Sequence, residues 1–169
     1  MLPLAIALLT LAAEPRETDS TFANLKPLTE ALARAEKVTL FEGLPHQFHE
    51  KDRLEAELKA KKTITHHGFP FYAEPLPLKA DEAKALRTLA ASEKSYQAWA
   101  GYKKCGGFHP DYLVEVSVGK ESYRMLVCFG CHEVKLFGPK SEVYVDMSDE
   151  GLHGLEEALK GRRKSRPKE

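Results

Sequence analysis

Apolar side chains recur at helical spacing in the first half of the chain. Leu25, Leu28, Leu32 and Ala35 stand three or four positions apart, which places them on one face of a helix. Short runs of β-forming residues interrupt this pattern. The sequence therefore predicts three helices and two strands before residue 91, with helices over 22–36, 47–61 and 81–90 and strands over 37–41 and 63–65.

Three local signals complete the prediction for this half. Asp81 is suited to cap the third helix, because a side-chain oxygen at that position can accept a backbone N–H. The aromatic run at 69–72 is expected to pack in the core. We expect residues 95–100, which include Trp99, to form a shorter helix.

The last third of the chain changes to a β pattern. Residues 112–118 and 122–128 are rich in β-formers and are separated by Gly119-Lys120, so they read as a hairpin in which Tyr112 lies opposite Val127. Two more strands and a closing helix follow, over 134–137, 142–146 and from the N-cap Ser148 through Leu159. The predicted fold class is α+β, with a small antiparallel sheet, a C-terminal hairpin and meander, flanked by helices.

The length and net charge of the chain limit its possible domain organisation and partners. A chain of 169 residues fits one domain, which we place at residues 22–160. The 25 basic residues balance the 25 acidic ones, so no overall field favours nucleic acid, and no nucleic-acid partner is expected. The basic tail over 161–169 is expected to be solvated.

The first thirteen residues are apolar and uncharged, and polar sequence begins at Glu14. The run is shorter than the roughly 20 residues that span a bilayer, and Ala12 and Ala13 suit a cleavage site. A signal peptide over 1–13 and a flexible leader over 14–21 are predicted; the alternative is a buried N-terminal helix, since no Lys or Arg precedes the run. The mature chain is then exported, periplasmic or extracellular, with no transmembrane segment.

Export makes the three cysteines informative, because thiols outside the cytoplasm tend to be oxidised or ligated and an odd number leaves one unpaired. If Gly119-Lys120 is the turn, Cys105 can loop back toward Cys128 and Cys131, helped by the glycines at 106 and 107. The cysteines would then meet at one end of the sheet with His109 and His132.

Covalent haem is one chemistry for this cluster. Cys128, Cys131 and His132 form a complete C-x-x-C-H string, in which two thiols bond the porphyrin and the histidine ligates iron. In small cytochromes the string opens a helix, whereas here it lies between two predicted strands.

A zinc site and a disulfide are the other two chemistries that the cysteine cluster could support. Cys105, Cys128 and Cys131 with His109 or His132 would make a tetrahedral Cys₃His site, although a second C-x-x-C is lacking. Alternatively, Cys105 pairs with Cys128 or Cys131. Asp111 and Glu133 bracket the cluster and could orient a ligating histidine. His46 and His49 could ligate metal as an i, i+3 pair, but are more simply surface residues.

Residues 38–168 resemble a group of uncharacterised exported bacterial proteins from planctomycete-like genomes. The matching strings are VTLFEGLPH from Val38, CGGFHPDY from Cys105 and CFGCHE from Cys128. A looser set of exported proteins resembles the chain in C-x-F-x-P followed by C-F-x-C without the last histidine. This resemblance implies no activity, and favours a structural thiol or metal site over haem.

The function expected from the sequence is a non-catalytic exported domain, a binding or interaction module with a structural cysteine cluster. The alternative is a small electron carrier with haem on Cys128, Cys131 and His132. A thiol redox or metal-dependent enzyme is a third hypothesis. The cofactor and the partner are left open.

Overall fold

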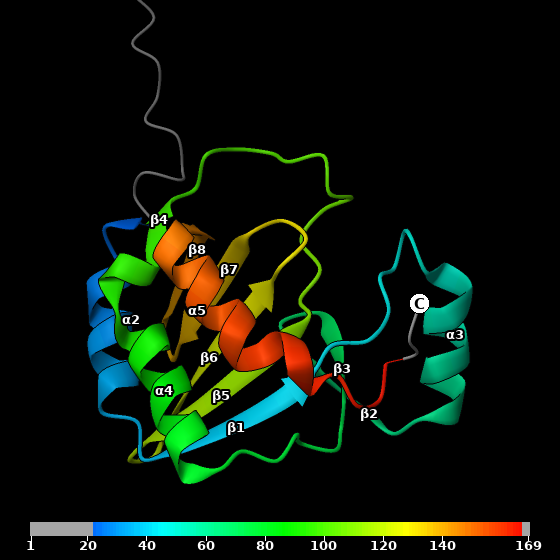
Figure 1. Ribbon diagram of the computed structural model, residues 1–169, viewed down its shortest axis with the longest axis horizontal. Helices are drawn as coiled ribbons and strands as arrows, with labels where there is room; N and C mark the ends of the chain where they lie inside the picture. The colour runs from blue at the N-terminus through cyan, green and yellow to red at the C-terminus, as the bar shows by residue number, and fades with distance from the viewer. Residues whose placement is uncertain (1–21, 167–169) are drawn as a thin grey trace, which may run out of the picture.

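The computed structural model describes residues 22–166. The predicted signal peptide and leader lie outside these residues. The centre of the fold is a six-stranded antiparallel sheet (Figure 1) with the strand order β1-β5-β6-β7-β8-β4. The strands are β1 (Lys37–Glu42), β4 (Tyr96–Ala98), β5 (Tyr112–Val118), β6 (Glu121–Cys128), β7 (Glu133–Gly138) and β8 (Ser141–Met147). The predicted α+β class is confirmed.

The meander β5–β8 forms as its sequence predicts. Tyr112 pairs with Val127, and Gly119 adopts a left-handed φ of 59° in the turn between β5 and β6. Ser148 caps the closing helix, because its hydroxyl accepts the N–H of Gly151 at 3.0 Å. The alternation of apolar and polar residues and the short local turns thus determine this part of the fold.

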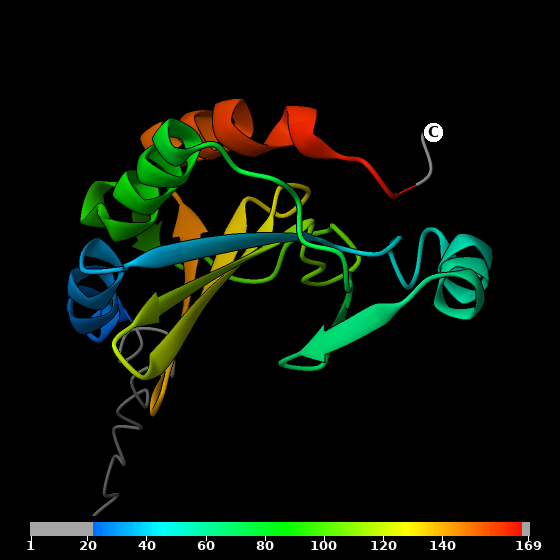
Figure 2. The same cartoon turned by 90° about the horizontal axis from the view of Figure 1, so that it is seen from below.

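Three helices cover one face of the sheet (Figure 2): α2 (Leu25–Ala33), α4 (Ala80–Ala91) and α5 (Asp149–Leu159). Their apolar faces pack on the side chains that every second strand residue sends toward them. The main core includes Leu28, Leu32, Leu86, Leu155 and Leu159 from the helices and Leu40, Val114, Met125, Leu136 and Val145 from the strands. Between residues 22 and 166, no helix is both long and apolar enough to cross a membrane.

A small hairpin lies at one end of the opposite face (Figure 2). It consists of β2 (Thr63–His66) and β3 (Phe69–Tyr72), and α3 (Lys51–Ala60) precedes it without burying any residue. Phe71 packs with Leu113, Leu126 and Phe137 in a second buried cluster. The expected core role of the aromatic run is confirmed, and the run is itself a strand.

Two local predictions are wrong. Residues 95–100 do not form a helix: a 3₁₀ turn, η1 (Glu93–Ser95), leads into β4, where Tyr96 pairs with Met147. The buried Tyr96 hydroxyl donates to the carbonyl of Ala90, which fixes this extended segment. Asp81 lies inside the first turn of α4, and the N-cap is Lys79.

The basic tail also departs from expectation. After η2 (Lys160–Arg162), the segment 163–166 does not project into solvent, and the Arg166 side chain is only 7% exposed. Its partners are carboxylates far away in the sequence.

Candidate functional site

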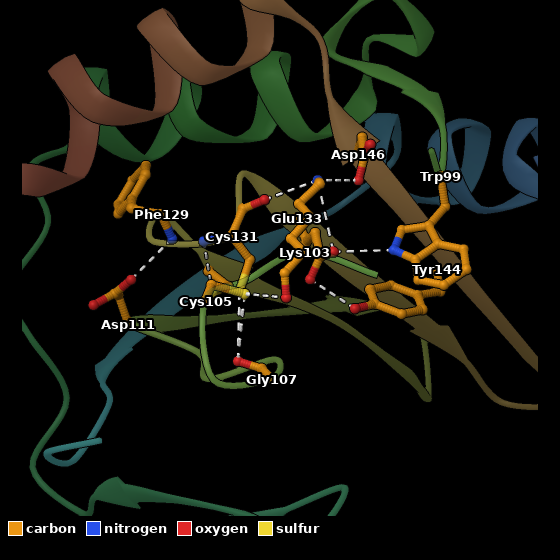
Figure 3. Close-up of a disulfide and its surroundings, with 11 residues drawn as sticks. Trp99, Lys103, Cys105, Gly107, Asp111, Phe129, Cys131, Glu133, Tyr144 and Asp146 are labelled. Atoms are coloured by element: carbon orange, nitrogen blue, oxygen red, sulfur yellow. Dashed lines mark hydrogen bonds and ion pairs between the residues drawn. A yellow bond between two sulfur atoms is a disulfide. The ribbon is translucent and has the colours of Figure 1, made fainter. Parts of the chain in front are cut away.

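Cys105 and Cys131 form a disulfide with a Cα–Cα distance of 5.7 Å (Figure 3). Cys105 comes from the loop after β4, and Cys131 from the turn between β6 and β7. Gly106 and Gly107 have φ values of 80° and 93°, which glycine adopts without strain, so the loop bends back to the sheet as expected. Of the two predicted pairings, the structure has Cys105 with Cys131.

Cys128 is the remaining thiol and is buried. Its sulfur accepts the N–H of Cys131 at 3.3 Å and the backbone N–H of His109. Burial raises the pKa of the Cys128 thiol to about 11. This sulfur therefore caps the β6–β7 turn as a neutral thiol, a state that is poorly nucleophilic.

The haem and zinc interpretations are not supported. Cys131 is bonded to Cys105, so the C-x-x-C-H string retains one free thiol where covalent haem attachment uses two. His132 is exposed at a φ of 55°. His109, the proposed zinc ligand, hydrogen-bonds the carbonyl of Leu44 at 2.8 Å. Within residues 22–166, no three His, Cys, Asp or Glu side chains are grouped to hold a metal ion.

A cavity of about 230 Å³ lies beside the disulfide. His46 and His109, whose ring centroids are 4.6 Å apart, form one side of it, and His49 is 4.4 Å from His46. Burial, followed by the repulsion of the neighbouring His109, lowers the pKa of His46; burial also lowers the pKa of His109. The cavity is lined by His46, Cys105, Gly107, His109, Asp111, Cys128, Phe129, Gly130, Cys131, Arg163 and Arg166.

His46 is oriented by the chain that follows it. Its Nδ1 accepts the N–H groups of Phe48 at 3.0 Å and His49 at 3.3 Å. The buried Nε2 has no hydrogen-bond partner. The i, i+3 histidine pair thus lies beside His109, with the His46 ring tilted by 44° to the ring of His49 and by 36° to that of His109.

A buried ion network supports the other side of the disulfide (Figure 3). Lys103 Nζ lies 2.5 Å from Asp146 Oδ1 and 3.6 Å from Glu133 Oε1, and donates to the Cys131 carbonyl at 2.8 Å. Both carboxylates are almost completely buried. One lysine therefore ties the loop after β4 to β7, β8 and the disulfide.

Glu133 and Asp111 do not orient a ligating histidine. Glu133 accepts the Trp99 indole N–H at 3.0 Å and the Tyr144 hydroxyl at 2.6 Å (Figure 3). Asp111 accepts the N–H of Phe129 at 2.9 Å and also binds the tail. Each carboxylate has a positioning role that the sequence pattern did not reveal.

Glu133 anchors a row of five aromatic rings, which we call the aromatic row: Tyr102, Trp99, Tyr144, Phe108 and Phe69. Successive ring centroids lie 5.2, 5.4, 5.7 and 5.4 Å apart. Tyr102, at one end, is 99% exposed. Sequence reasoning missed this feature; the only available signal was the pair of aromatics just before Cys105.

No protein family and no curated protein matches this sequence. Among solved structures, the chain is similar to a "Putative Lipoprotein" from Clostridium perfringens, with 11% identity and a TM-score of 0.41. That comparison covers 89% of this chain and 98% of the other. At this level of similarity it carries no argument about function.

Proposed function

We propose that this chain is an exported, non-catalytic binding module that contacts a protein partner through the aromatic row. The observation that carries the proposal is the position of Tyr102, fully exposed at the end of a row whose inner rings are fixed. Contiguous exposed apolar surface is typical of interaction sites, and the four rings behind Tyr102 are partly exposed.

Pre-organisation supports this assignment. Trp99 and Tyr144 are held by the buried Glu133, and the disulfide ties the loop that carries Trp99 and Tyr102 to the sheet. Rings that are fixed before binding lose little conformational freedom in a complex, so they contribute more to affinity. Tyr and Trp are also the residue types that dominate interface energies.

Two further observations favour an exported binding role. A disulfide persists outside the reducing cytoplasm, which agrees with the signal peptide predicted over residues 1–13. The free thiol is buried and its pKa is raised, whereas catalytic cysteines are accessible and have lowered pKa values.

Site-specific cross-linking tests the proposal. A photoreactive residue replaces Tyr102 in the chain as the producing bacterium exports it, and the control carries the same residue at Phe48, an aromatic 68% exposed elsewhere. We expect one protein to be captured at position 102 and not at 48. Equal capture at the two positions, or no capture at 102, would overturn the assignment.

The captured protein is then purified and titrated against the wild-type chain. Trp99 is the single tryptophan, so its fluorescence reports contact with the aromatic row directly. We expect a saturable change, weakened at least about tenfold by Tyr102→Ala and unchanged by Phe48→Ala. Equal affinity of both variants would contradict the proposed surface.

A further inference from the structure

The C-terminal segment 163–166 is bound to the fold as a bent, non-helical peptide. It runs from α5 toward α3, across the end of β1 (Figure 1). Four carboxylates hold it. Those of Glu42, Glu50 and Asp111 form a set that we call the acidic cleft, and the exposed Glu74 binds Lys164 at 2.8 Å outside that set. The cleft draws on residues that are far apart in the sequence and meet only in the folded chain.

Glu42 binds the backbone of the segment. Its carboxylate is 1% exposed and accepts three consecutive N–H groups, from Lys164 at 3.0 Å, Ser165 at 2.8 Å and Arg166 at 2.9 Å. A buried carboxylate is costly unless it is hydrogen-bonded, so Glu42 needs such donors. Main-chain N–H groups are the same in any sequence, and Glu42 therefore selects a bent backbone whose successive N–H groups point to one carboxylate, and not particular side chains.

Asp111 and Glu50 bind the two arginine side chains of the segment. Asp111 Oδ1 accepts Arg163 at 2.9 Å and Arg166 at 3.1 Å, and Glu50 also binds Arg166. The two arginines are three positions apart, and each presents a planar guanidinium that suits a carboxylate. The cleft thus recognises arginine at positions i and i+3 of a bent segment.

Both carboxylates are oriented by the fold itself. The second oxygen of Asp111 accepts the N–H of Phe129, and Glu50 accepts the N–H of His46 at 2.9 Å. Burial alone would raise the pKa of Glu50, but the His46 N–H and Arg166 lower it. The cleft is therefore pre-organised for a cationic occupant.

The contact between the segment and the cleft consists of hydrogen bonds and ion pairs. Three carboxylates face two guanidiniums, and the remaining negative charge favours a basic ligand. Salt weakens the contact of the more exposed Arg163, whereas the buried pairs of Arg166 are screened much less. Because residues 163–166 are tethered to the cleft, their effective concentration there is high, and they fill it before a free peptide does.

We propose that the acidic cleft is a recognition site for bent, non-helical peptide segments with arginine at i and i+3. The chain's own residues 163–166 occupy it in cis, and a segment of this type from another protein displaces them. This site shares no residue with the aromatic row, and the inference goes beyond the proposed function and does not depend on it.

The wild-type chain provides the first test. The probe is the peptide acetyl-Arg-Lys-Ser-Arg-amide, added in excess to ¹⁵N-labelled protein at low salt. We expect the amide resonances of Lys164, Ser165 and Arg166 to move toward random-coil positions while those of β5 and β6 stay in place. If these tail resonances do not move at saturating peptide, the added peptide does not displace residues 163–166. That result would overturn the proposal and show that the segment is a permanent part of the fold.

A vacated cleft provides the second test. The variant Arg163→Gln/Arg166→Gln removes both guanidiniums from the cis segment, and calorimetry measures binding of the same peptide. We expect at least about tenfold tighter binding than to wild type, because the competing cis segment is weakened. A Lys-Lys-Ser-Lys peptide of equal charge should bind at least about fivefold more weakly, since lysine lacks the planar fork.

Equal binding of the two peptides would reduce the site to non-specific charge attraction and contradict the proposal. If the variant does not fold, the wild-type resonances still decide the question. Tyr102→Ala should bind the peptide as wild type does, so failure of the aromatic row and failure of this site are distinguishable.

Discussion

Cys131 is bonded to Cys105, 26 residues earlier, although Cys128 lies only three residues before it. The Cys128 sulfur instead accepts the N–H of Cys131 and stabilises the turn between them. The C-x-x-C string is therefore divided between two roles, one sulfur closing a long loop and the other closing a short turn.

Removing the disulfide should lower the free energy of unfolding. A bridge that closes a loop of this length is worth about 3 kcal/mol, because it restricts the unfolded chain. Urea unfolding of the wild-type chain with and without reductant measures the change. The Cys105→Ser/Cys131→Ser variant should already show the loss and should not respond to reductant; a response of that variant would point to another bond.

Cys128 should be inert in the folded chain. With a pKa of about 11, about one thiol in a thousand is ionised at pH 8, and burial blocks access to it. Intact mass after iodoacetamide treatment should show no adduct under native conditions and one adduct in urea without reductant. Rapid native labelling would show that this sulfur is accessible and would favour a thiol-redox role.

The histidine cluster should make stability depend on pH. The folded-state pKa of His46 and of His109 is lowered, first by burial, so the unfolded chain takes up protons near pH 6.5 that the folded chain does not. Stability should be level above about pH 7 and should fall as the pH decreases from about 6.5 toward the lowered values. Burial lowers the pKa of His66 and His67 as well, which adds to the same slope.

Variants can separate the contributions to that slope. His109→Gln removes one titrating ring but keeps an N–H for the Leu44 carbonyl, so the slope of unfolding free energy against pH should become smaller. His153→Gln on the exposed side of α5 is the control. An unchanged slope in His109→Gln would show that His109 takes up protons equally in the folded and the unfolded chain.

Lys103 should be essential to the loop that carries the aromatic row. Lys103→Met leaves the buried carboxylates of Glu133 and Asp146 without their cation, which should cost about 3 kcal/mol. The exposed neighbour provides the control, since Lys104→Met should change stability by no more than about 0.5 kcal/mol. Urea unfolding of both variants gives the comparison, and equal values would refute the importance of the network.

Gly43 should tolerate no side chain. A Cβ there would lie 2.0 Å from the carbonyl oxygen of Pro110 and 3.1 Å from that of Asp111, and backbone atoms cannot rotate away. Gly43→Ala should cost about 1–3 kcal/mol and displace Asp111 from the acidic cleft. Gly130→Ala faces open space and should stay within about 0.5 kcal/mol of wild type, so equal thermal stability of the two variants would contradict the close approach.

The meander and the position of the cysteines could be predicted because local patterns determine them. Alternating side chains and the turn at Gly119 fix β5 and β6, and their register brings residue 128 to the end of the sheet that Cys105 reaches. The choice between Cys128 and Cys131 depends on the backbone of the tight turn, which the spacing of the residues does not specify.

Other features depend on partners far away in the sequence. β4 has three residues and becomes a strand only by pairing with β8, about 50 residues later, so no pattern of its own marks it. Arg166 binds Glu50 and Asp111 across 116 and 55 residues. The carboxylate partners of the basic tail lie far away in the sequence, so the run of basic residues by itself predicts a solvated tail. The acidic cleft could therefore not be found from the sequence.

The strand order also has a consequence for how the chain folds. β5 to β8 are consecutive, so each pairs with the next through a short turn, whereas β1 and β4 join the two edges from outside that run. Loop closure costs entropy, and we expect the four central strands to become protected from hydrogen exchange before β1 does. During synthesis β1 emerges early but has no partner until β5 follows it, so the N-terminal half must wait for the C-terminal half before either can complete the sheet.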